Sequence, residues 1–526
     1  MKKKFDRNYI YIVLAWFISC IICLGAEYYI TNGEMGVPLD DTWIHFQFAD
    51  NFSNGHFFEY NIGEPTAGTT SPLYVIVLGT AGLITKNFIL SSLLISSLFY
   101  LFSCLLVYKI SMLIFEMAQS QFQNSAVKDF ISPGFLSILA ALLTVFAGRF
   151  AWAGLSGMET TMFTFFCLAG VLSYLKDIQS KRFTLLPTLL FALAATSRPE
   201  GFLLYSIYIL VMFVNSIKVK TLRSNYFRIF ISVFIFLCLT LPYFIFSYKL
   251  SGNFLPNTFR GQGGHFDFIP DLTYVRIGII FFFRDNFFTA LLYLFAVLFY
   301  FKNTKRFFND LKYLNMIFLW IILLPAVSSI VIPNWRHHVR YLIPLIPFIN
   351  IASVYVLELV MRTNFFVKFN KSFLRPKKVG ITILAVSFIY YAVYVIALGK
   401  NTDNINNQQV KLAAWVNENV PRDATIALND IGAITFINKN RIIDMAGLVT
   451  PEMLQYGKYN IEDRLDSINY LLKKNNVSYI IIYDHWYREF LDKYGNTLTF
   501  VTSAYLEENT ICGGDEMKVY KTNYNR

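Results

Sequence analysis

The sequence predicts a polytopic α-helical membrane protein that ends in a small α/β domain. Of its 526 residues, 55% are hydrophobic and only 15% are charged, whereas a soluble globular protein carries about 25% charged residues. The apolar residues form long blocks, as membrane-spanning helices require. From about residue 400 the composition changes, and polar helix patterns alternate with short strand-like runs. We therefore expect a transmembrane module at 1–398 and an α/β domain at 399–526.

Eleven apolar blocks are candidate membrane spans, because a bilayer core of about 30 Å needs roughly 20 apolar residues per helix. They are 9–30, 88–115, 133–150, 157–176, 183–197, 199–216, 226–248, 285–301, 311–332, 341–361 and 379–398. The block at 183–197 is short. The first block is longer than the apolar part of a signal peptide and lacks a small-residue cleavage site, so we expect an uncleaved anchor.

The distribution of Lys and Arg predicts the orientation of the spans, since cytoplasmic loops are enriched in these residues. Alternate loops are basic, beginning with Lys2, Lys3, Lys4 and Arg7. The loop at 31–72 instead has no Lys or Arg and carries six acidic residues, so it is predicted to face outward. The alternation requires that the apolar segment 73–86 does not cross the membrane. We expect a juxtamembrane or re-entrant helix there, within an outer loop at 31–87.

The net charge of +12 does not indicate a nucleic-acid partner, because the basic residues lie in short loops between apolar blocks. The six cysteines have no metal-binding spacing. In the C-terminal part, residues 406–419 have a helical pattern, and the runs 426–428 and 479–483 resemble strands. With eleven crossings, this domain lies outside.

Asp40 and Asp41 stand at the start of a helical pattern in the first outer loop. One interpretation is a helix cap, because Asp accepts hydrogen bonds from free backbone N–H groups at a helix start. The other is a general base, since two adjacent carboxylates at an apolar surface raise each other's pKa. Either residue could cap the helix while its neighbour points elsewhere.

The same loop continues with a Gly-, Pro- and Thr-rich segment at 61–72, which predicts a structured turn. It is either a connection that ends at Pro72, the first position of the next helix, or a wall of hydroxyls that hydrogen-bonds a sugar. The hydroxyls concerned are those of Thr69, Thr70 and Ser71.

Several cations are predicted at the outer side of the membrane. They are Arg149, Arg198, Arg336, His337, His338 and Arg340. A single cation at this position can extend its side chain to the lipid headgroups. Several cations on one face of the membrane instead favour the binding of an anionic phosphate. His337 and His338 make a poor metal pair, because adjacent residues rarely point at one ion.

Two acidic residues, Glu159 and Glu200, are expected to form ion pairs with these arginines, and Glu159 is also a candidate substrate contact. The glycine-rich loop at 255–265 lacks the spacing of a nucleotide-binding loop. We expect a flexible outer loop that covers a substrate, with Asn257 and Arg260 as contacts.

These motifs together resemble the GT-C superfamily of polytopic glycosyltransferases, which use lipid-phosphate-linked sugars. The resemblance is strongest to the bacterial branch that contains arabinofuranosyltransferase-like and mannosyltransferase-like enzymes. It rests on LDDTWIHFQFADNFSNGH, EYNIGEPTAGTTSPLY, LSGMET, SRPEG, PNTF, RYLIPL, IGAITF and IIDMAGLV, in family order across nearly the whole chain. The WWDYG-type signature of oligosaccharyltransferases is absent from the sequence, which argues against transfer of a whole glycan to asparagine.

Membership in this family would imply juxtamembrane helices in the first outer loop and a variable outer C-terminal domain. It would assign the role of base to Asp40 or Asp41, and donor-phosphate binding to the outer arginines. The expected partners are a polyprenyl-phosphate-linked sugar, a glycan or lipid-glycan acceptor, and membrane lipid. The expected reaction is an inverting transfer that needs no nucleotide and no metal, on the periplasmic side of a bacterial inner membrane.

Three other functions are compatible with a polytopic membrane protein. A transporter or flippase for lipid-linked sugars would place ionisable groups at mid-membrane and often has inverted repeats. A polyprenyl-linked glycan polymerase or ligase would typically have a large outer loop late in the chain. The third alternative is a non-catalytic outer-face binding protein.

Overall fold

The computed structural model describes residues 6–122, 132–218, 222–252, 254, 256–261, 269–362 and 376–524. The chain forms two compact units, each assembled from three segments of the sequence. Unit 1 comprises Met1–Cys23, Leu94–Leu241 and Phe266–Val395, and unit 2 comprises Leu24–Leu93, Pro242–His265 and Ile396–Arg526. The first outer loop therefore belongs to the same unit as the C-terminal domain.

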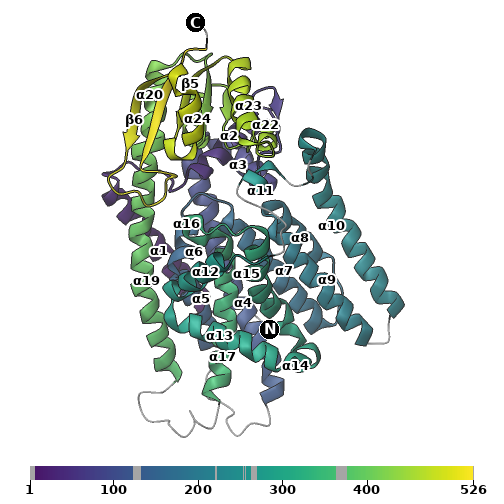
Figure 1. The fold of residues 1–526 in the computed structure, drawn as a ribbon. Helices are drawn as coiled ribbons and strands as arrows, with labels where there is room; N and C mark the ends of the chain where they lie inside the picture. Colours follow the sequence, from purple (N-terminus) through teal and green to yellow (C-terminus); the bar gives the residue numbers. More distant parts are fainter. Residues whose placement is uncertain are drawn as a thin grey trace. The chain divides into compact units, whose positions relative to one another are not determined.

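Unit 1 is helical in the part of it that the structure describes (Figure 1). Its helices are α5 (Pro133–Val145), α6 (Gly148–Gly154), α7 (Thr160–Ser180), α8 (Leu186–Ser197), α9 (Glu200–Lys218), α12 (Leu272–Asp285), α13 (Phe287–Lys302), α14 (Thr304–Asn309), α15 (Asn315–Val331), α16 (Arg336–Val339) and α17 (Ile346–Met361). Short 3₁₀ turns lie at Lys312–Leu314 and Arg340–Leu345. Four further helices have residues in both units: α1 (Asn8–Ile30), α4 (Phe88–Phe122), α10 (Leu222–Ser251) and α19 (Pro376–Ile405).

A helix lies at each of the eleven predicted spans, and the chain is a multi-pass membrane protein. Seven helices in the described residues are long and apolar enough to cross a bilayer, and α5 with α6 would make an eighth. The spans predicted at 183–197, 199–216 and 285–301 correspond to the shorter apolar helices α8, α9 and α13. The sequence analysis did not predict the amphipathic helix α12.

The span predicted at 133–150 is broken rather than continuous. Helices α5 and α6 meet at an angle of 63°. The break precedes Gly148, where an added Cβ would lie 2.4 Å from the Tyr394 ring. Gly148 thus allows a close approach by an aromatic ring from a distant part of unit 1.

Unit 2 contains the outer-loop elements α2 (Asp40–Ser53), β1 (Glu59–Asn61), β2 (Glu64–Pro65) and α3 (Pro72–Thr85), and also α11 (Asn257–Gly261). Helix α3 confirms the helix predicted at 73–86. The C-terminal helices are a π-helical turn at Asn406–Val410, α20 (Lys411–Asn419), α21 (Gly432–Asn438), α22 (Pro451–Tyr456), α23 (Ile461–Lys474) and α24 (Arg488–Tyr494). Short 3₁₀ turns lie at Asp484–Trp486 and Gly495–Thr497.

The C-terminal part of unit 2 is a mixed α/β domain, as predicted. Its strands are β3 (Thr425–Leu428), β4 (Ile442–Asp444), β5 (Val477–Ile482), β6 (Leu498–Tyr505) and β7 (Glu516–Thr522). The sheet order is β4-β3-β5-β7-β6, in which β4, β3 and β5 are parallel and β7 is antiparallel to both β5 and β6. The strand-like runs at 426–428 and 479–483 are confirmed as β3 and β5.

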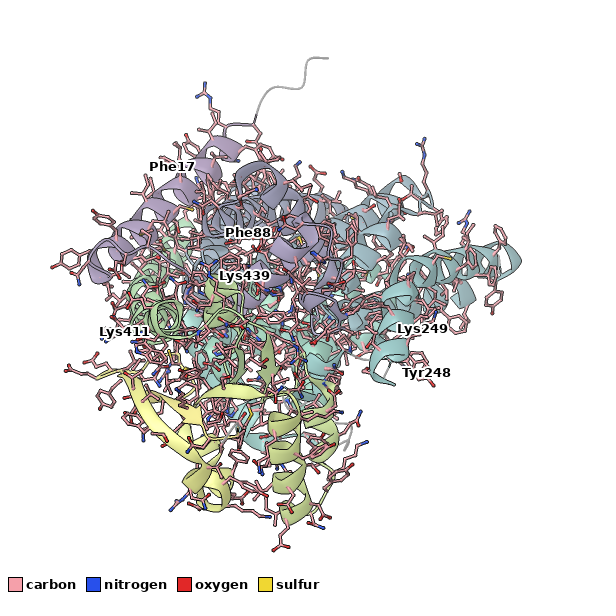
Figure 2. All side chains as sticks on the ribbon, turned by 90° about the horizontal axis from the view of Figure 1, so that it is seen from above. Phe17, Phe88, Tyr248, Lys249, Lys411 and Lys439 are labelled. Atoms are coloured by element: carbon pink, nitrogen blue, oxygen red, sulfur yellow. The ribbon has the colours of Figure 1, made fainter. Side chains whose placement is uncertain are left out.

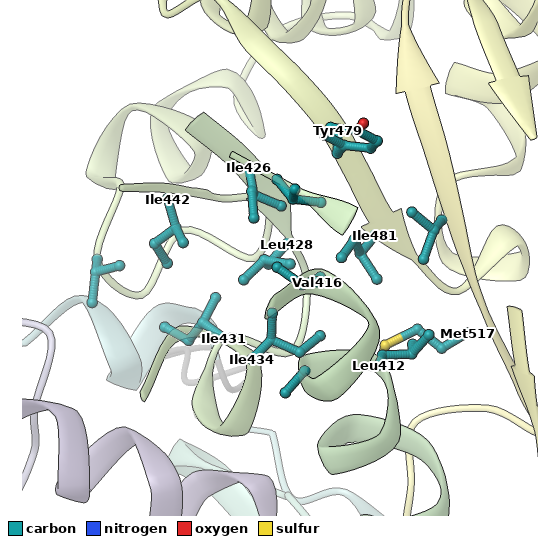
Figure 3. Close-up of a cluster of buried hydrophobic side chains, with 14 of the residues drawn as sticks. Leu412, Val416, Ile426, Leu428, Ile431, Ile434, Ile442, Tyr479, Ile481 and Met517 are labelled. Atoms are coloured by element: carbon teal, nitrogen blue, oxygen red, sulfur yellow. The ribbon is translucent and has the colours of Figure 1, made fainter. Parts of the chain in front are cut away.

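Two apolar clusters cover opposite faces of this sheet, because successive side chains of a strand point to opposite sides. Ile426, Leu428 and Ile481 pack with Leu412 and Val416 of α20 (Figure 3). On the other face, Ala427, Ile480 and Ile482 pack with residues of α23 and α24. Both cores are buried, so the sheet is held between two layers of helices.

Helix α21 packs against helix α2 of the outer loop within unit 2. The Phe436 ring contacts Phe88, Trp43 and Phe46, with ring centroids 5.8, 5.6 and 5.7 Å away. Lys439, which is labelled in Figure 2, follows the last residue of α21. Its ammonium lies 4.2 Å from the centroid of the Phe436 ring and 2.7 Å from the Asp50 carboxylate. The outer loop is thus built into the core of unit 2.

Candidate functional site

Asp40 is tied to the C-terminal domain through its carboxylate. Oδ2 accepts a hydrogen bond from the Gly432 backbone N–H at 2.8 Å, and Oδ1 accepts one from Ala433 N–H at 2.8 Å. These donors are the free N–H groups at the start of α21, which favour a negative charge. The approach requires glycine, because a Cβ on Gly432 would lie 2.2 Å from the Asp40 carbonyl oxygen. Asp40 therefore caps a helix that lies 392 residues further along the chain.

The interpretation that Asp40 caps its own helix is wrong. Helix α2 begins at Asp40 itself, Leu39 occupies the cap position, and no side chain hydrogen-bonds there. Asp40 and Asp41 are the first two helical residues, where their charge favours the N-terminal end of the helix. The helix predicted to follow these aspartates is confirmed, and it already includes both of them.

A third aspartate, Asp430, interacts electrostatically with Asp40 and Asp41. It was not identified as a candidate site residue from the sequence. Its carboxylate accepts hydrogen bonds from the Gln409 amide at 2.9 Å, the Tyr483 hydroxyl at 2.9 Å and the Asn429 amide at 3.1 Å. Gln408 accepts a further bond from Tyr483 at 2.7 Å. Both glutamines lie on the π-helical turn, a feature that often occurs at functional sites.

The pKa values of Asp40 and Asp430 are raised, and the charge of Asp41 contributes to both shifts; we call these three residues the aspartate cluster. Burial raises the pKa of Asp40 most, and the negative charges of Asp430 and Asp41 raise it further, against the two backbone hydrogen bonds. Burial likewise raises the pKa of Asp430, with a contribution from Asp41. Such coupled carboxylates are typical of sites that exchange a proton.

The predicted turn at 61–72 exists, and the Thr69 hydroxyl stabilises it. The Thr69 hydroxyl accepts a bond from the Ser71 backbone N–H at 3.1 Å, and the Thr69 carbonyl accepts one from the Tyr243 hydroxyl. Ser71 precedes Pro72, the first residue of α3, as predicted. Thr70 is half-buried. Sugar binding by these three residues stays a prediction.

Arg149 is buried in unit 1 and forms an ion pair with Asp285. Its Nε and Nη2 donate to the two carboxylate oxygens at 2.7 and 2.5 Å, and Nη1 donates to the His338 carbonyl at 3.0 Å. The Arg149 side chain is fully buried. This bidentate pair accounts for a buried arginine without a phosphate.

The positive charge of Arg198 is likewise compensated by buried carboxylates. Nη1 donates to Glu159 at 2.9 Å, and Nη2 donates to Glu200 at 2.7 Å. The guanidinium also lies 4.9 Å from the centroid of the Tyr341 ring. The predicted pairing of Glu159 and Glu200 with an outer arginine is confirmed, and the arginine is Arg198.

The segment from Arg336 to Arg340 has an unusual backbone. His337, His338 and Val339 have φ values of 52°, 60° and 53°, a conformation that side chains other than glycine rarely adopt and that a β-branched valine disfavours strongly. Arg336 is exposed, whereas Arg340 is buried. The His338 ring contacts Trp152 and Tyr394, with centroids 4.9 and 5.5 Å away. Strain of this kind is concentrated at functional sites.

The loop predicted at 255–265 is partly described. Asn257 begins α11 and is buried, with 4% of its surface exposed. The side chain of Arg260 and residues 262–268 lie outside the described residues. Among the described residues, no group of three or more His, Cys, Asp or Glu side chains is arranged to hold a metal ion.

Two acidic residues that contact the predicted site residues, Asp285 and Asp430, were not predicted from the sequence. Asp285 follows an apolar run, and an ionisable residue at that depth is a candidate by default. Asp430 follows strand β3 directly and precedes the IGAITF motif. Polar residues at the carboxyl end of a parallel strand often line sites.

The comparisons with known proteins cover the C-terminal domain and the whole chain. Residues 403–520 match the family described as a domain of unknown function (DUF8728). No curated protein matches the chain.

Solved structures match over nearly the whole chain. ArnT from Cupriavidus metallidurans, bound to undecaprenyl phosphate, is 13% identical with a TM-score of 0.59, over 96% of this chain and 97% of that one. The oligosaccharyltransferase AglB from Archaeoglobus fulgidus, in complex with an inhibitory peptide and a dolichol-phosphate, is 12% identical with a TM-score of 0.56, over 90% of this chain and 69% of that one. The chain therefore has the fold of the GT-C superfamily, as the sequence motifs predicted.

Proposed function

We propose that this chain is an inverting glycosyltransferase. It moves a sugar from a polyprenyl-monophosphate donor to an acceptor hydroxyl at the outer face of a bacterial inner membrane. The observation that carries the proposal is the Asp40–Asp41 pair at the start of α2, with Asp40 fixed by the backbone of α21. The GT-C fold supports it, because the similar structures hold undecaprenyl phosphate and dolichol-phosphate.

Asp41 is the proposed general base, and Asp40 is a positioning residue. Both carboxylate oxygens of Asp40 accept backbone hydrogen bonds, so we assign this side chain a structural role. Asp41 follows on the same turn, is partly exposed, and acts electrostatically on Asp40 and Asp430. A carboxylate next to two others retains a proton more readily after it has taken one from a hydroxyl.

In the proposed reaction, Asp41 takes the proton of the acceptor hydroxyl, and the oxygen attacks the anomeric carbon. The bond from that carbon to the phosphate oxygen breaks, and the polyprenyl phosphate leaves with one more negative charge. A single displacement inverts the configuration, whereas retention would need a second displacement through a nucleophilic carboxylate. No metal or nucleotide takes part in this scheme, so a chelator such as EDTA should leave the rate unchanged.

The donor phosphate is proposed to bind the segment from Arg336 to Arg340. The charges of Arg149 and Arg198 are compensated by buried carboxylates, which leaves these two arginines little net attraction for an anion. This segment carries two arginines, of which Arg336 is exposed and Arg340 is buried. A guanidinium next to the departing phosphate would stabilise its growing charge in a water-poor site.

The test is a transfer assay with purified chain in lipid vesicles and radiolabelled polyprenyl-phosphate sugars. Asp41→Asn should lower kcat by about 10²–10⁴-fold, the usual contribution of a general base, at an unchanged melting temperature. Asp40→Asn should lower both stability and activity, because an amide cannot accept both backbone hydrogen bonds. Asp423→Asn is the control, since it removes an exposed carboxylate outside the aspartate cluster.

Two outcomes would contradict the proposal. Full transfer by Asp41→Asn would exclude Asp41 as the base. Movement of the lipid-linked sugar across the vesicle membrane, without transfer to any acceptor, would favour the alternative of a flippase.

A further inference from the structure

Unit 2 contains an open pocket whose walls come from all three of its sequence segments. The empty volume is about 910 Å³, part of which is open to solvent. The walls include Asn61 and Thr66 from the outer loop, Asn257 from α11, and Arg441, Thr450 and Glu452 from the C-terminal domain. None of these residues takes part in the proposed proton transfer.

The wall of the pocket is polar in the part that the structure describes. Among the described lining residues, Arg441 is the one basic side chain, and it forms an ion pair with Glu64 at 2.8 Å. Glu452 adds a second carboxylate, so the two glutamates and the arginine give a net charge of −1. A phosphate or other anion is disfavoured at such a wall. Amides and hydroxyls suit a neutral ligand that carries several hydroxyl groups.

Asn257 is the polar residue that α11 contributes to the wall of the pocket. Only 4% of its surface is exposed, and it lines the pocket. Its side-chain carbonyl and NH₂ groups provide two donors and two acceptor positions. Hydroxyl groups of a ligand inside the pocket would match them.

The pocket adjoins the aspartate cluster through Tyr60. This buried side chain lines the pocket, and its hydroxyl donates to the Ile431 carbonyl at 2.7 Å. The next residue, Gly432, is one of the two donors to Asp40. A ligand in the pocket is therefore separated from the carboxylates by one aromatic side chain and one turn of backbone.

We infer that this pocket binds a neutral sugar unit of the acceptor, with Asn257 as the principal contact. The inference rests on the proposed function. The acceptor is favoured over the donor, because the transferred sugar carries its phosphate directly on the reacting carbon, and the wall of the pocket is negative.

The test measures binding without a donor, on the purified full chain in nanodiscs. Saturation-transfer NMR is recorded with the methyl glycosides of glucose, galactose and mannose, and with the methyl glycoside of glucuronic acid as an anionic comparator. At least one neutral glycoside should bind, and Asn257→Ala should weaken its binding by about 10-fold, the effect of about one good hydrogen bond. The anionic glycoside should bind more weakly, and Glu452→Gln should reduce this difference.

Two controls make the result interpretable. Asn419→Ala removes an exposed amide of α20, far in sequence from the pocket residues and bonded only to its own helix, and should leave binding unchanged. If Asn257→Ala fails to fold, Glu452→Ala replaces it, because Glu452 is exposed on α22. No binding of any neutral glycoside at about 50 mM, well above the Kd of even weak sugar complexes, would overturn the inference.

The inference and the proposed function fail in different ways. Loss of transfer in Asp41→Asn together with an unchanged acceptor KM in Asn257→Ala would refute the acceptor pocket alone. Binding that Asn257→Ala weakens, without transfer from any polyprenyl-phosphate sugar, would refute the transferase reaction and leave the sugar site in place.

Discussion

At the scale of single residues, burial and pairing decide what each ionisable group does. Asp40 and Asp41 are neighbours with the same chemistry, yet the carboxylate of Asp40 is held by two backbone N–H groups. Arg149 pairs with one carboxylate, and Arg198 pairs with two. Counting the ionisable residues in the sequence therefore overestimates how many of their side chains can bind a substrate.

The buried aspartates of unit 2 predict that stability falls as the pH rises. Burial raises the pKa of Asp444 to about 6, above the value of about 3.9 in an unfolded chain. The folded state then binds the extra proton between these values, so its stability is highest near pH 4 and is lost progressively up to pH 6, by on the order of 3 kcal/mol. The pKa values of Asp40 and Asp430 are raised in the same direction.

Melting temperatures of the full chain in detergent, recorded from pH 4 to pH 7, measure this effect. Asp444→Asn should flatten the profile, because an amide does not ionise in this range. Its overall stability should be lower, since Asp444 accepts hydrogen bonds from the Ala446 and Val449 backbone N–H groups. An identical slope in the variant and the wild type would exclude Asp444 as the cause.

Removal of the Arg198 guanidinium should strongly destabilise unit 1. Arg198→Met leaves Glu159 and Glu200 buried without their cation, and breaking a buried ion pair in this way costs about 3–5 kcal/mol. The triple variant Arg198→Met, Glu159→Gln, Glu200→Gln should recover much of the loss, because no charge is then buried. The yield of folded protein and its melting temperature are the measurements.

A surface ion pair provides the comparison for Arg198. Lys518→Met breaks the partly exposed pair with Asp484 and should cost less than about 1 kcal/mol. If Arg198→Met were as stable as Lys518→Met, the pairing with the two glutamates would not be structural.

At the scale of elements, short helices carry the aspartate cluster. Helix α21 has seven residues, too few to be stable alone. It is held by the Asp40 cap and by the contacts of Phe436 and Lys439 with the outer loop. The π-helical turn at Asn406–Val410 in turn directs two adjacent glutamines at Asp430 and Tyr483.

Gly432→Ala should separate α2 from α21. The added methyl group would lie 2.2 Å from the Asp40 carbonyl oxygen, which is backbone and cannot rotate away. Displacement would lengthen both hydrogen bonds to Asp40, so we expect a loss of about 1–3 kcal/mol and a lower kcat in the transfer assay. Gly495→Ala is the matched control, because no atom lies within 4 Å of its added Cβ. Equal stability of the two variants would contradict the cap.

At the scale of the whole molecule, the orientation in the membrane remains to be tested by labelling. Single cysteines at Ile62, Trp335 and Tyr505, which are 67%, 50% and 63% exposed, are introduced into a cysteine-free chain. An impermeant maleimide should label all three from the outside of spheroplasts. A cysteine at Lys181, in a basic loop, should react only after the membrane is opened. Labelling of positions 62 and 335 from opposite sides would refute the predicted orientation.

The periodicity and composition of the sequence were sufficient to predict the helices and strands that depend on local sequence. The apolar blocks predicted a helix at every span position, and the alternating pattern predicted β3 and β5, because burial in lipid or in a sheet core is a property of each segment. The start of α2 at Asp40 could also be read locally. The same motifs, in their order, predicted the GT-C fold that the structural matches share.

Only the tertiary structure decided what the polar residues contact. The ring that packs against Gly148 is 246 positions away in the sequence, the partner of Arg149 is Asp285, and the helix that Asp40 caps begins at residue 432. Hydrogen bonds and ion pairs act over a few ångströms regardless of separation along the chain, so no local pattern encodes them. The sequence by itself determined which segments are apolar and where carboxylates are adjacent, and the fold determined which backbone groups hold the carboxylate of Asp40.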